Sequence, residues 1–192
     1  MTESTRQRIV SAAVSLFAEQ GYDATSVNQV VQRAQVAKGA LYHHFTSKDD
    51  LLFEVYHELI GRQLDGMKAI LAKGLSPAET LRELIVDLVT TTAARASEAK
   101  VFAREGHRLG DENQKRLRSA RREYHDAVTE LIRAAQVSGE FSDVASAEMV
   151  TFTLFGVINE LPVWYQPQGR KRPDTIADEL SSFVLAGLEP KK

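Results

Sequence analysis

The sequence predicts an all-α protein of about nine helices, and two observations carry that prediction. Apolar residues recur at every third or fourth position through most of the 192-residue chain, as they do on amphipathic helices. The strict alternation that is typical of strands is not found along the sequence. A chain of this length can bury one large core, or a small domain plus a larger one.

The first two helices are marked by their apolar stripes and by the residues at their ends. The first helix stops at Gly21 and has a stripe formed by Ile9, Ala12, Ala13, Leu16 and Phe17. Thr25 and Ser26 offer hydroxyls that can cap the second helix, and Gln29 follows Ser26 at the spacing of a capping box. The buried stripe of the second helix is expected to consist of Val27, Val30, Val31 and Ala34.

A tight turn separates the second helix from a third, which is expected at residues 38–45. Leu41 and Phe45 are one turn apart and point inward, so the opposite face is open to solvent. That face has side chains suited to the base edges and phosphates of DNA, namely Lys38, Gly39, Tyr42 and His43. His44 points about 100° away from His43, so we expect it to pack. Two short helices joined in this way form a helix-turn-helix, whose second helix fits a major groove.

Helical periodicity continues to the end of the chain and predicts six further helices. Ser47 supplies a capping hydroxyl for the first of them, and Asp49 and Asp50 suit the positive end of its dipole. The six helices are expected at residues 49–73, 77–97, 101–109, 112–137, 145–165 and 173–188.

Composition and motifs exclude several other classes of protein. A chain without cysteine has no disulfide or thiolate site, which fits a cytoplasmic protein. No apolar stretch reaches the ~18 residues that a membrane span needs, so we expect no membrane partner. His57 and Glu58 begin like a zinc-protease motif, but Gly61 stands where its second histidine would be. Neither a phosphate loop nor a serine-hydrolase elbow occurs, so we expect no catalytic residue, no metal and no cofactor.

Two stretches of the N-terminal segment carry a family resemblance. Residues 17–26 read Phe-Ala-Glu-Gln-Gly-Tyr-Asp-Ala-Thr-Ser, and residues 38–45 read Lys-Gly-Ala-Leu-Tyr-His-His-Phe, with Ser47 and Lys48 close behind. This segment resembles the N-terminal domain of the TetR family of bacterial transcriptional regulators, and the chain length and helical remainder agree. The resemblance implies a helix-turn-helix DNA-binding domain over residues 1–47 and a helical domain for ligand binding and dimerisation over residues 48–192. It also implies a homodimeric repressor that a small-molecule effector releases from an inverted-repeat operator in double-stranded DNA.

Matched position by position, the resemblance places particular residues on DNA. It implies phosphate contacts for Thr25, Ser26, Tyr42, His43 and Lys48. It implies positions near base edges for Asn28, Lys38, Gly39 and Ala40. Many relatives have Ser or Thr where this chain has Ala37 and Ala40, so a helix cap is lost and the operator cannot be copied from a relative.

The charge of the N-terminal segment is modest for a DNA-binding protein. The whole chain has a formal net charge of −2, whereas residues 1–48 hold Arg6, Arg8, Arg33, Lys38 and Lys48 against Glu3, Glu19 and Asp23. Affinity would therefore depend on a few phosphate contacts that a dimer doubles. A non-specific architectural DNA-binding protein and a helical enzyme are alternatives. The large helical remainder argues against the first of these, because coating DNA needs no second domain.

The last two expected helices suit a contact between two copies of the chain. In the resembling family these helices pair with their counterparts, which implies a homodimer through residues about 145–188. The helix at 145–165 is apolar on more than one face, and Gly156 would permit close approach of another helix. Phe183 and Val184 belong to a matching stripe on the last helix. The alternative is that both helices are simply part of the core.

An effector cavity is expected among the middle helices. Its candidate lining residues are Phe102, His107, Tyr124, Phe155, Asn159 and Trp164. The basic residues Arg118, Arg121 and Arg122 share a helix face and could hold the phosphates of an anionic effector. Residues 102–109 and 164–167 resemble TetR members that control lipid or steroid catabolism, which implies an acyl-CoA. The alternatives are a solvated basic surface and an uncharged hydrophobic inducer.

Overall fold

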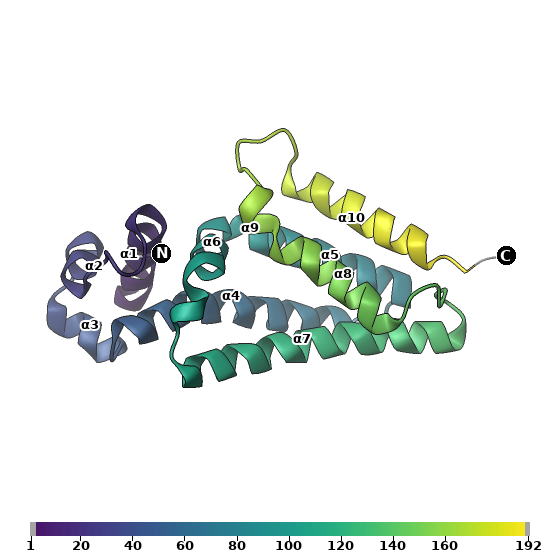
Figure 1. The fold of residues 1–192 in the computed structure, drawn as a ribbon, viewed down its shortest axis with the longest axis horizontal. Helices are drawn as coiled ribbons and strands as arrows, with labels where there is room; N and C mark the ends of the chain where they lie inside the picture. Colours follow the sequence, from purple (N-terminus) through teal and green to yellow (C-terminus); the bar gives the residue numbers. More distant parts are fainter. Residues whose placement is uncertain (1–2, 191–192) are drawn as a thin grey trace. The chain divides into compact units, whose positions relative to one another are not determined.

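The computed structural model describes residues 3–190, and the regular structure of these residues is entirely helical (Figure 1). This confirms the predicted all-α class. The elements are α1 (Thr5–Gln20), α2 (Val27–Ala34), α3 (Lys38–His44), α4 (Lys48–Leu71), α5 (Pro77–Ala94), α6 (Ala96–Glu105), the 3₁₀ turn η1 (Gly106–Arg108), α7 (Asp111–Ser138), α8 (Ala147–Asn159), α9 (Leu161–Trp164) and α10 (Pro173–Leu188).

The helices form two compact units. The first unit comprises the residues up to 60 together with 95–118, and the second comprises 61–94 together with the residues from 119 onward. The boundaries of these units differ from the predicted domain boundary between residues 47 and 48. That domain boundary stays a prediction.

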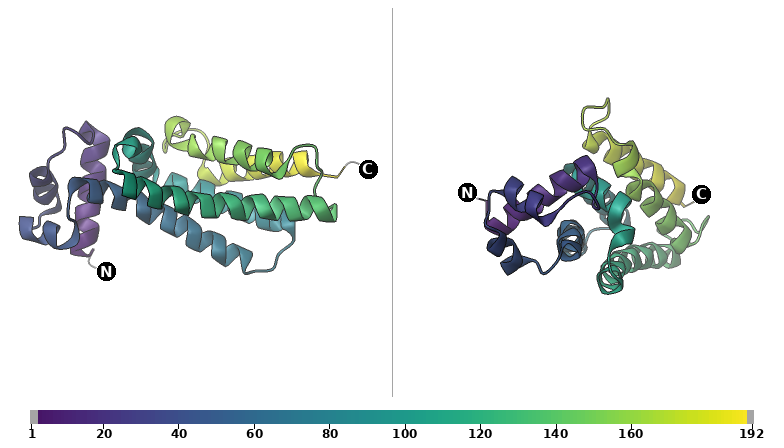
Figure 2. Two further views of the ribbon diagram at one scale, coloured as in Figure 1. Left: turned by 60° about the horizontal axis from the view of Figure 1, so that its bottom comes forward. Right: turned by 60° about the vertical axis from the view of Figure 1, so that its left-hand side comes forward.

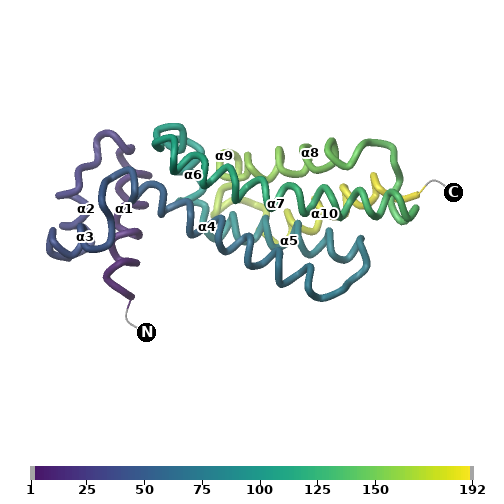
Figure 3. The backbone as a smooth tube through the Cα atoms, turned by 90° about the horizontal axis from the view of Figure 1, so that it is seen from below, coloured from purple at the N-terminus to yellow at the C-terminus, as the bar shows by residue number. Residues whose placement is uncertain are grey.

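In the first unit, α2 and α3 pack against α1 and against each other (Figure 3). α1 ends at Gly21, where a φ of 90° favours glycine. The predicted capping box of α2 is confirmed, because Ser26 Oγ accepts from the Gln29 backbone N–H at 3.2 Å and Gln29 Oε1 accepts from the Ser26 N–H at 2.7 Å. Of the expected stripe, Val30 and Ala34 are buried, whereas Val27 and Val31 are only partly buried.

In the second unit, α5 packs against α8, α9 and α10 (Figures 1 and 2). Its buried residues repeat at helical spacing and are Thr80, Leu81, Leu84, Ile85, Leu88, Val89 and Thr92. The apolar members join one core cluster with Met67 of α4, Val128 of α7 and Leu154 of α8. This cluster is the hydrophobic core of the unit.

Two of the predicted helix boundaries are wrong. The helix expected at 145–165 is interrupted at Glu160, just before Pro162, and forms α8 and α9. Proline lacks an N–H and its ring clashes with the carbonyl four residues earlier, so a continuous helix is disfavoured there.

The second difference lies between α5 and α6. The helix expected at 77–97 ends at Ala94, and the one expected at 101–109 begins at Ala96 and closes in η1. Arg95 between them has non-helical angles of φ −118° and ψ 38°, and its guanidinium donates to Glu98 Oε1 at 3.0 Å. At the break, Arg95 forms ion pairs with Glu98 and Glu58.

Candidate nucleic-acid interface and effector region

The exposed side of α3 is the side that the sequence predicted. Leu41 and Phe45 are buried, while Lys38, Gly39, Tyr42 and His43 are exposed and Ala40 is partly exposed. As expected, Ala37 makes no side-chain cap. A Cβ added at Gly39 would meet no atom within 4 Å, so the backbone there is open to close approach. The assignment of these residues to bases and phosphates stays a prediction.

The expectation that His44 packs is wrong. His44 is exposed, and its ring lies edge-on to that of His43, with 5.1 Å between the ring centres. α3 ends at His44, and the backbone is extended from Phe45 onward. The inward direction is taken by Phe45, which leaves His44 on the exposed side. Two imidazoles therefore stand side by side at the end of the candidate recognition helix.

Ser26 and Asn28 are exposed at the start of α2, as a place near DNA requires. The hydroxyl of Ser26 is engaged in the cap, because it accepts from the Gln29 N–H and lies 3.0 Å from Gln29 Oε1. Its role in starting the helix is thus established by the geometry, and its phosphate contact stays a prediction.

Thr25 is held inside the turn between α1 and α2. Its hydroxyl donates to the Gly21 carbonyl at 2.7 Å, and its backbone N–H donates to the Tyr22 carbonyl at 3.2 Å. The side chain is buried, with 1% of its surface exposed. Both donors of Thr25 are used within the turn, which argues against the phosphate contact that was expected of it.

Lys48 also contacts this turn. Its Nζ donates to the carbonyls of Tyr22 and Thr25 at 2.9 and 3.0 Å and lies 4.1 Å from the centre of the Tyr22 ring. An ammonium group has three N–H donors, so at most one of them is left for a phosphate. This structural role could not be predicted from the sequence, because the residues that Lys48 holds are more than 20 positions away.

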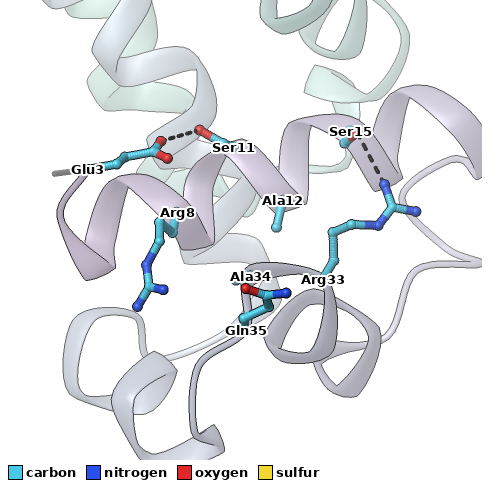
Figure 4. Close-up of a pocket in the computed structure, with 8 residues that line it drawn as sticks. All are labelled: Glu3, Arg8, Ser11, Ala12, Ser15, Arg33, Ala34 and Gln35. Atoms are coloured by element: carbon cyan, nitrogen blue, oxygen red, sulfur yellow. Dashed lines mark hydrogen bonds between the residues drawn. The ribbon is translucent and has the colours of Figure 1, made fainter.

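A shallow cleft of about 300 Å³ lies between α1 and the end of α2 (Figure 4). Its lining residues are Glu3, Arg8, Ser11, Ala12, Ser15, Arg33, Ala34 and Gln35. Arg33 is paired with Glu19 through two N–H···O bonds of 3.0 Å. The residues expected around an effector do not line this cleft.

The residues expected around an effector are divided between the two units. Phe102, His107 and Arg118 belong to the first unit, and the second contains Arg121, Arg122, Tyr124, Phe155, Asn159 and Trp164. Within the second unit, the structure brings Tyr124 and Phe155 together edge to face, with ring centres 5.7 Å apart. Phe102 instead stacks on Tyr56 within the first unit, with the two ring centres 3.4 Å apart.

Several of these residues are exposed. The three arginines, His107 and Asn159 are exposed, and Trp164 has 48% of its surface exposed. Asn159 is the last residue of α8 and is exposed there, and its place in the lining of an effector cavity stays a prediction.

A polar group that the sequence analysis missed lies inside the second unit. Asp87 Oδ2 and the Tyr124 hydroxyl are buried, and neither has a hydrogen-bond partner among the described residues. A Cβ at Gly66 would come within 2.7 Å of Asp87 Oδ2, so the glycine lets this carboxylate lie against α4. Burial raises the pKa of both groups, and the nearby charge of Asp87 raises the pKa of Tyr124 further. Its position within the apolar run 84–89 was the signal that could have identified Asp87.

α8 and α10 each present large apolar side chains to solvent. Met149, Phe152 and Val157 on α8 are exposed, as is Phe183 on α10, with 62% exposure for Phe152 and 76% for Phe183. A Cβ at Gly156 would meet no atom within 4 Å. Exposed apolar patches of this kind mark contact surfaces in soluble proteins.

Residues 3–190 contain no group of three or more His, Asp or Glu side chains that is placed to hold a metal ion. None of the helices described above is both long and apolar enough to cross a membrane.

Two family models match this chain, one toward each end. Residues 9–55 match the model of bacterial regulatory proteins of the tetR family, and residues 74–188 match that of the tetracyclin repressor-like C-terminal domain. The HTH-type transcriptional repressor KstR2 of Rhodococcus jostii RHA1 is 28% identical over 95% of this chain and 90% of its own length.

Solved structures share the fold. The crystal structure of a bacterial regulatory protein in the tetR family from Rhodococcus RHA1 is 22% identical, covers 100% of both chains and has a TM-score of 0.88. The crystal structure of AibR in complex with isovaleryl coenzyme A and operator DNA is 22% identical, covers 98% of this chain and 100% of the AibR chain, and has a TM-score of 0.81. Because the C-terminal domain model alone matches more than half of the sequence, the chain belongs to the TetR family of bacterial regulatory proteins, and it is a transcriptional regulator and not an enzyme.

Proposed function

We propose that this protein is a transcriptional repressor that binds an inverted-repeat operator as a homodimer and leaves it when a small amphipathic molecule binds. The observation that most supports DNA recognition is the exposed face of α3, where Lys38, Tyr42 and His43 project from a helix anchored by Leu41 and Phe45. A short exposed helix after a supporting one fits a major groove. The likeness to the repressor KstR2 supports repression as the mode of control. We place this activity in the cytoplasm.

Footprinting on DNA selected from a random pool tests operator binding. We expect protection of two half-sites related by a twofold axis and about 34–36 Å apart, because two identical recognition helices must meet successive major grooves. Protection that is equal on every sequence would instead support an architectural DNA-binding protein.

The exposed apolar side chains of α8 and α10 support the homodimer. Phe152 and Phe183 are costly to leave in water, and a symmetric contact with a second copy would bury both. The open backbone at Gly156 would allow the two copies of α8 to approach closely. The dimer places two α3 helices on one operator.

We further propose that the effector is an acyl-CoA and that no other cofactor is needed. The likeness to AibR, whose structure contains isovaleryl coenzyme A, supports this class of ligand. Arg121 and Arg122 are exposed on α7 and offer forked donors to phosphates, while Tyr124 and Phe155 provide apolar surface in the same unit. The buried Tyr124 hydroxyl, which has no hydrogen-bond partner among the described residues, could donate to the carbonyl oxygen of the acyl part.

Calorimetry with isovaleryl-CoA, isovalerate and free CoA tests the effector. We expect the thioester to bind more tightly than either fragment, and Arg121→Ala or Arg122→Ala to weaken it. Lys115→Ala is the matched control, because it removes one exposed positive charge from the same helix. Equal and negligible binding of all three probes would favour an uncharged hydrophobic inducer.

A further inference from the structure

Glu105 is the one charged side chain among the buried residues of the described chain. Its Oε1 accepts from Arg104 Nε at 2.9 Å and from the backbone N–H of Tyr22 at 3.4 Å, and its Oε2 accepts from Arg108 Nε at 3.0 Å. A buried carboxylate is costly unless donors surround it, and here two of the donors are cationic. The end of α6 thus contacts the turn between α1 and α2 through an ionised group.

The two arginines reach the same region. Arg104 Nη2 donates to the Phe17 carbonyl in the last turn of α1. Arg108 Nη1 pairs with Asp23 Oδ2 at 2.7 Å. We call Arg104, Glu105 and Arg108 the α6 clamp. Arg104 binds the end of α1, Glu105 binds the backbone of the turn at Tyr22, and Arg108 binds the side chain of Asp23 in the turn.

Lys48 binds the same turn from α4, through the carbonyls of Tyr22 and Thr25. Directly after Thr25 comes Ser26, which caps α2. α2 is the supporting helix of the helix-turn-helix, so the place where it begins is determined by a turn that α4 and the α6 clamp hold together.

We propose that the α6 clamp is a positioning device for DNA binding, in which Glu105 sets the location of the turn at residues 21–25 and thereby of α2. Its members are positioning residues that do not need to touch DNA. The inference rests on the proposed DNA binding. Each contact of the clamp lies within the first unit. These contacts are therefore the ones through which a movement of α6 would reach the helix-turn-helix.

Glu105→Gln tests the proposal with Glu98→Gln as the matched control. Glu98 is on the same helix and is also an ion-paired, largely buried carboxylate, but its partner Arg95 pairs in turn with Glu58 of α4. In Glu105→Gln, operator affinity should fall by about 3- to 30-fold, a range typical of residues that act through others. The slope of affinity against salt should stay unchanged, because the number of phosphate contacts is the same.

Amide hydrogen exchange gives a readout that needs no DNA. Exchange at residues 21–26 should accelerate in Glu105→Gln and stay as in the wild type in Glu98→Gln. Wild-type operator affinity together with unchanged exchange in folded Glu105→Gln would overturn the proposal. If the wild type binds no DNA at all, the proposed function fails, while the exchange experiment still decides whether the clamp holds the turn.

A double-mutant cycle of Arg108→Gln and Asp23→Asn covers the case in which Glu105→Gln does not fold. The side chains of Arg108 and Asp23 are exposed, at 39% and 68%, so these variants should remain folded. The cycle cancels the direct effect of removing a negative charge near DNA. A coupling of at least about threefold in operator affinity is expected, and strictly additive effects would contradict the clamp.

Discussion

At the scale of single residues, Lys48 has a role in the fold that is separate from any contact with DNA. Its Nζ bonds two backbone carbonyls of the turn at residues 21–25. Lys48→Ala should lower the free energy of unfolding by about 1–3 kcal/mol, since hydrogen bonds from charged groups are lost. Urea unfolding measures this. Lys73→Ala is the control, because the exposed pair Lys73–Glu83 should contribute less than about 1 kcal/mol. Equal losses in the two variants would contradict the structural role of Lys48.

Lys38 is exposed at the start of α3 and is the best candidate for reading a base. Lys38→Ala should relax the preference for one base pair by ~1–3 kcal/mol and leave the fold intact. Competition binding with single-position variants of the selected operator measures the change. An unchanged preferred site with unchanged discrimination would remove Lys38 from the base contacts.

The ionisation of Glu105 should make stability depend on pH. Burial acts to raise the pKa of this carboxyl, but the bonds from Arg104 and the Tyr22 N–H outweigh it, and the pKa lies below its ordinary value of 4.5. The charged form therefore stabilises the fold at neutral pH, and this contribution is lost as the pH falls below that value. Urea unfolding at neutral pH and at ~pH 3.5 should show a smaller acid loss in Glu105→Gln than in the wild type. A parallel loss in both proteins would assign the acid sensitivity to other carboxyls.

At the scale of helices, local signals were sufficient where the determinant lies within a few residues. The capping box of Ser26 and Gln29 and the inward pair Leu41 and Phe45 could be read from spacing alone. Contacts between distant residues could not be read in this way. The sequence therefore did not predict the bonds of Lys48 to the turn, nor the contact of Glu105 with Tyr22, which is more than 80 positions away. The break before Pro162 was predictable from proline chemistry but was hidden by the apolar run around it.

The apolar faces of α8 and α10 carry the prediction for dimerisation. Phe152→Glu or Phe183→Glu should give monomers with weak operator binding, because a dimer would have to bury the new charge. Light scattering coupled to gel filtration measures the mass. Val137→Glu on α7 is the control, since Val137 is 85% exposed and lies outside the proposed contact. Dimers of unchanged stability in both phenylalanine variants would place the interface elsewhere.

At the scale of the whole molecule, effector and operator should compete through two conformations of one protein. Release requires only that the effector bind the conformation with low DNA affinity more tightly, and the coupling is then reciprocal. If isovaleryl-CoA weakens operator binding by a given factor, typically about 5- to 150-fold, operator DNA must weaken isovaleryl-CoA binding by the same factor. Calorimetric titrations with and without saturating operator measure both affinities. An effector that binds equally well to free and DNA-bound protein cannot shift the population, so that result would separate ligand binding from regulation in this protein.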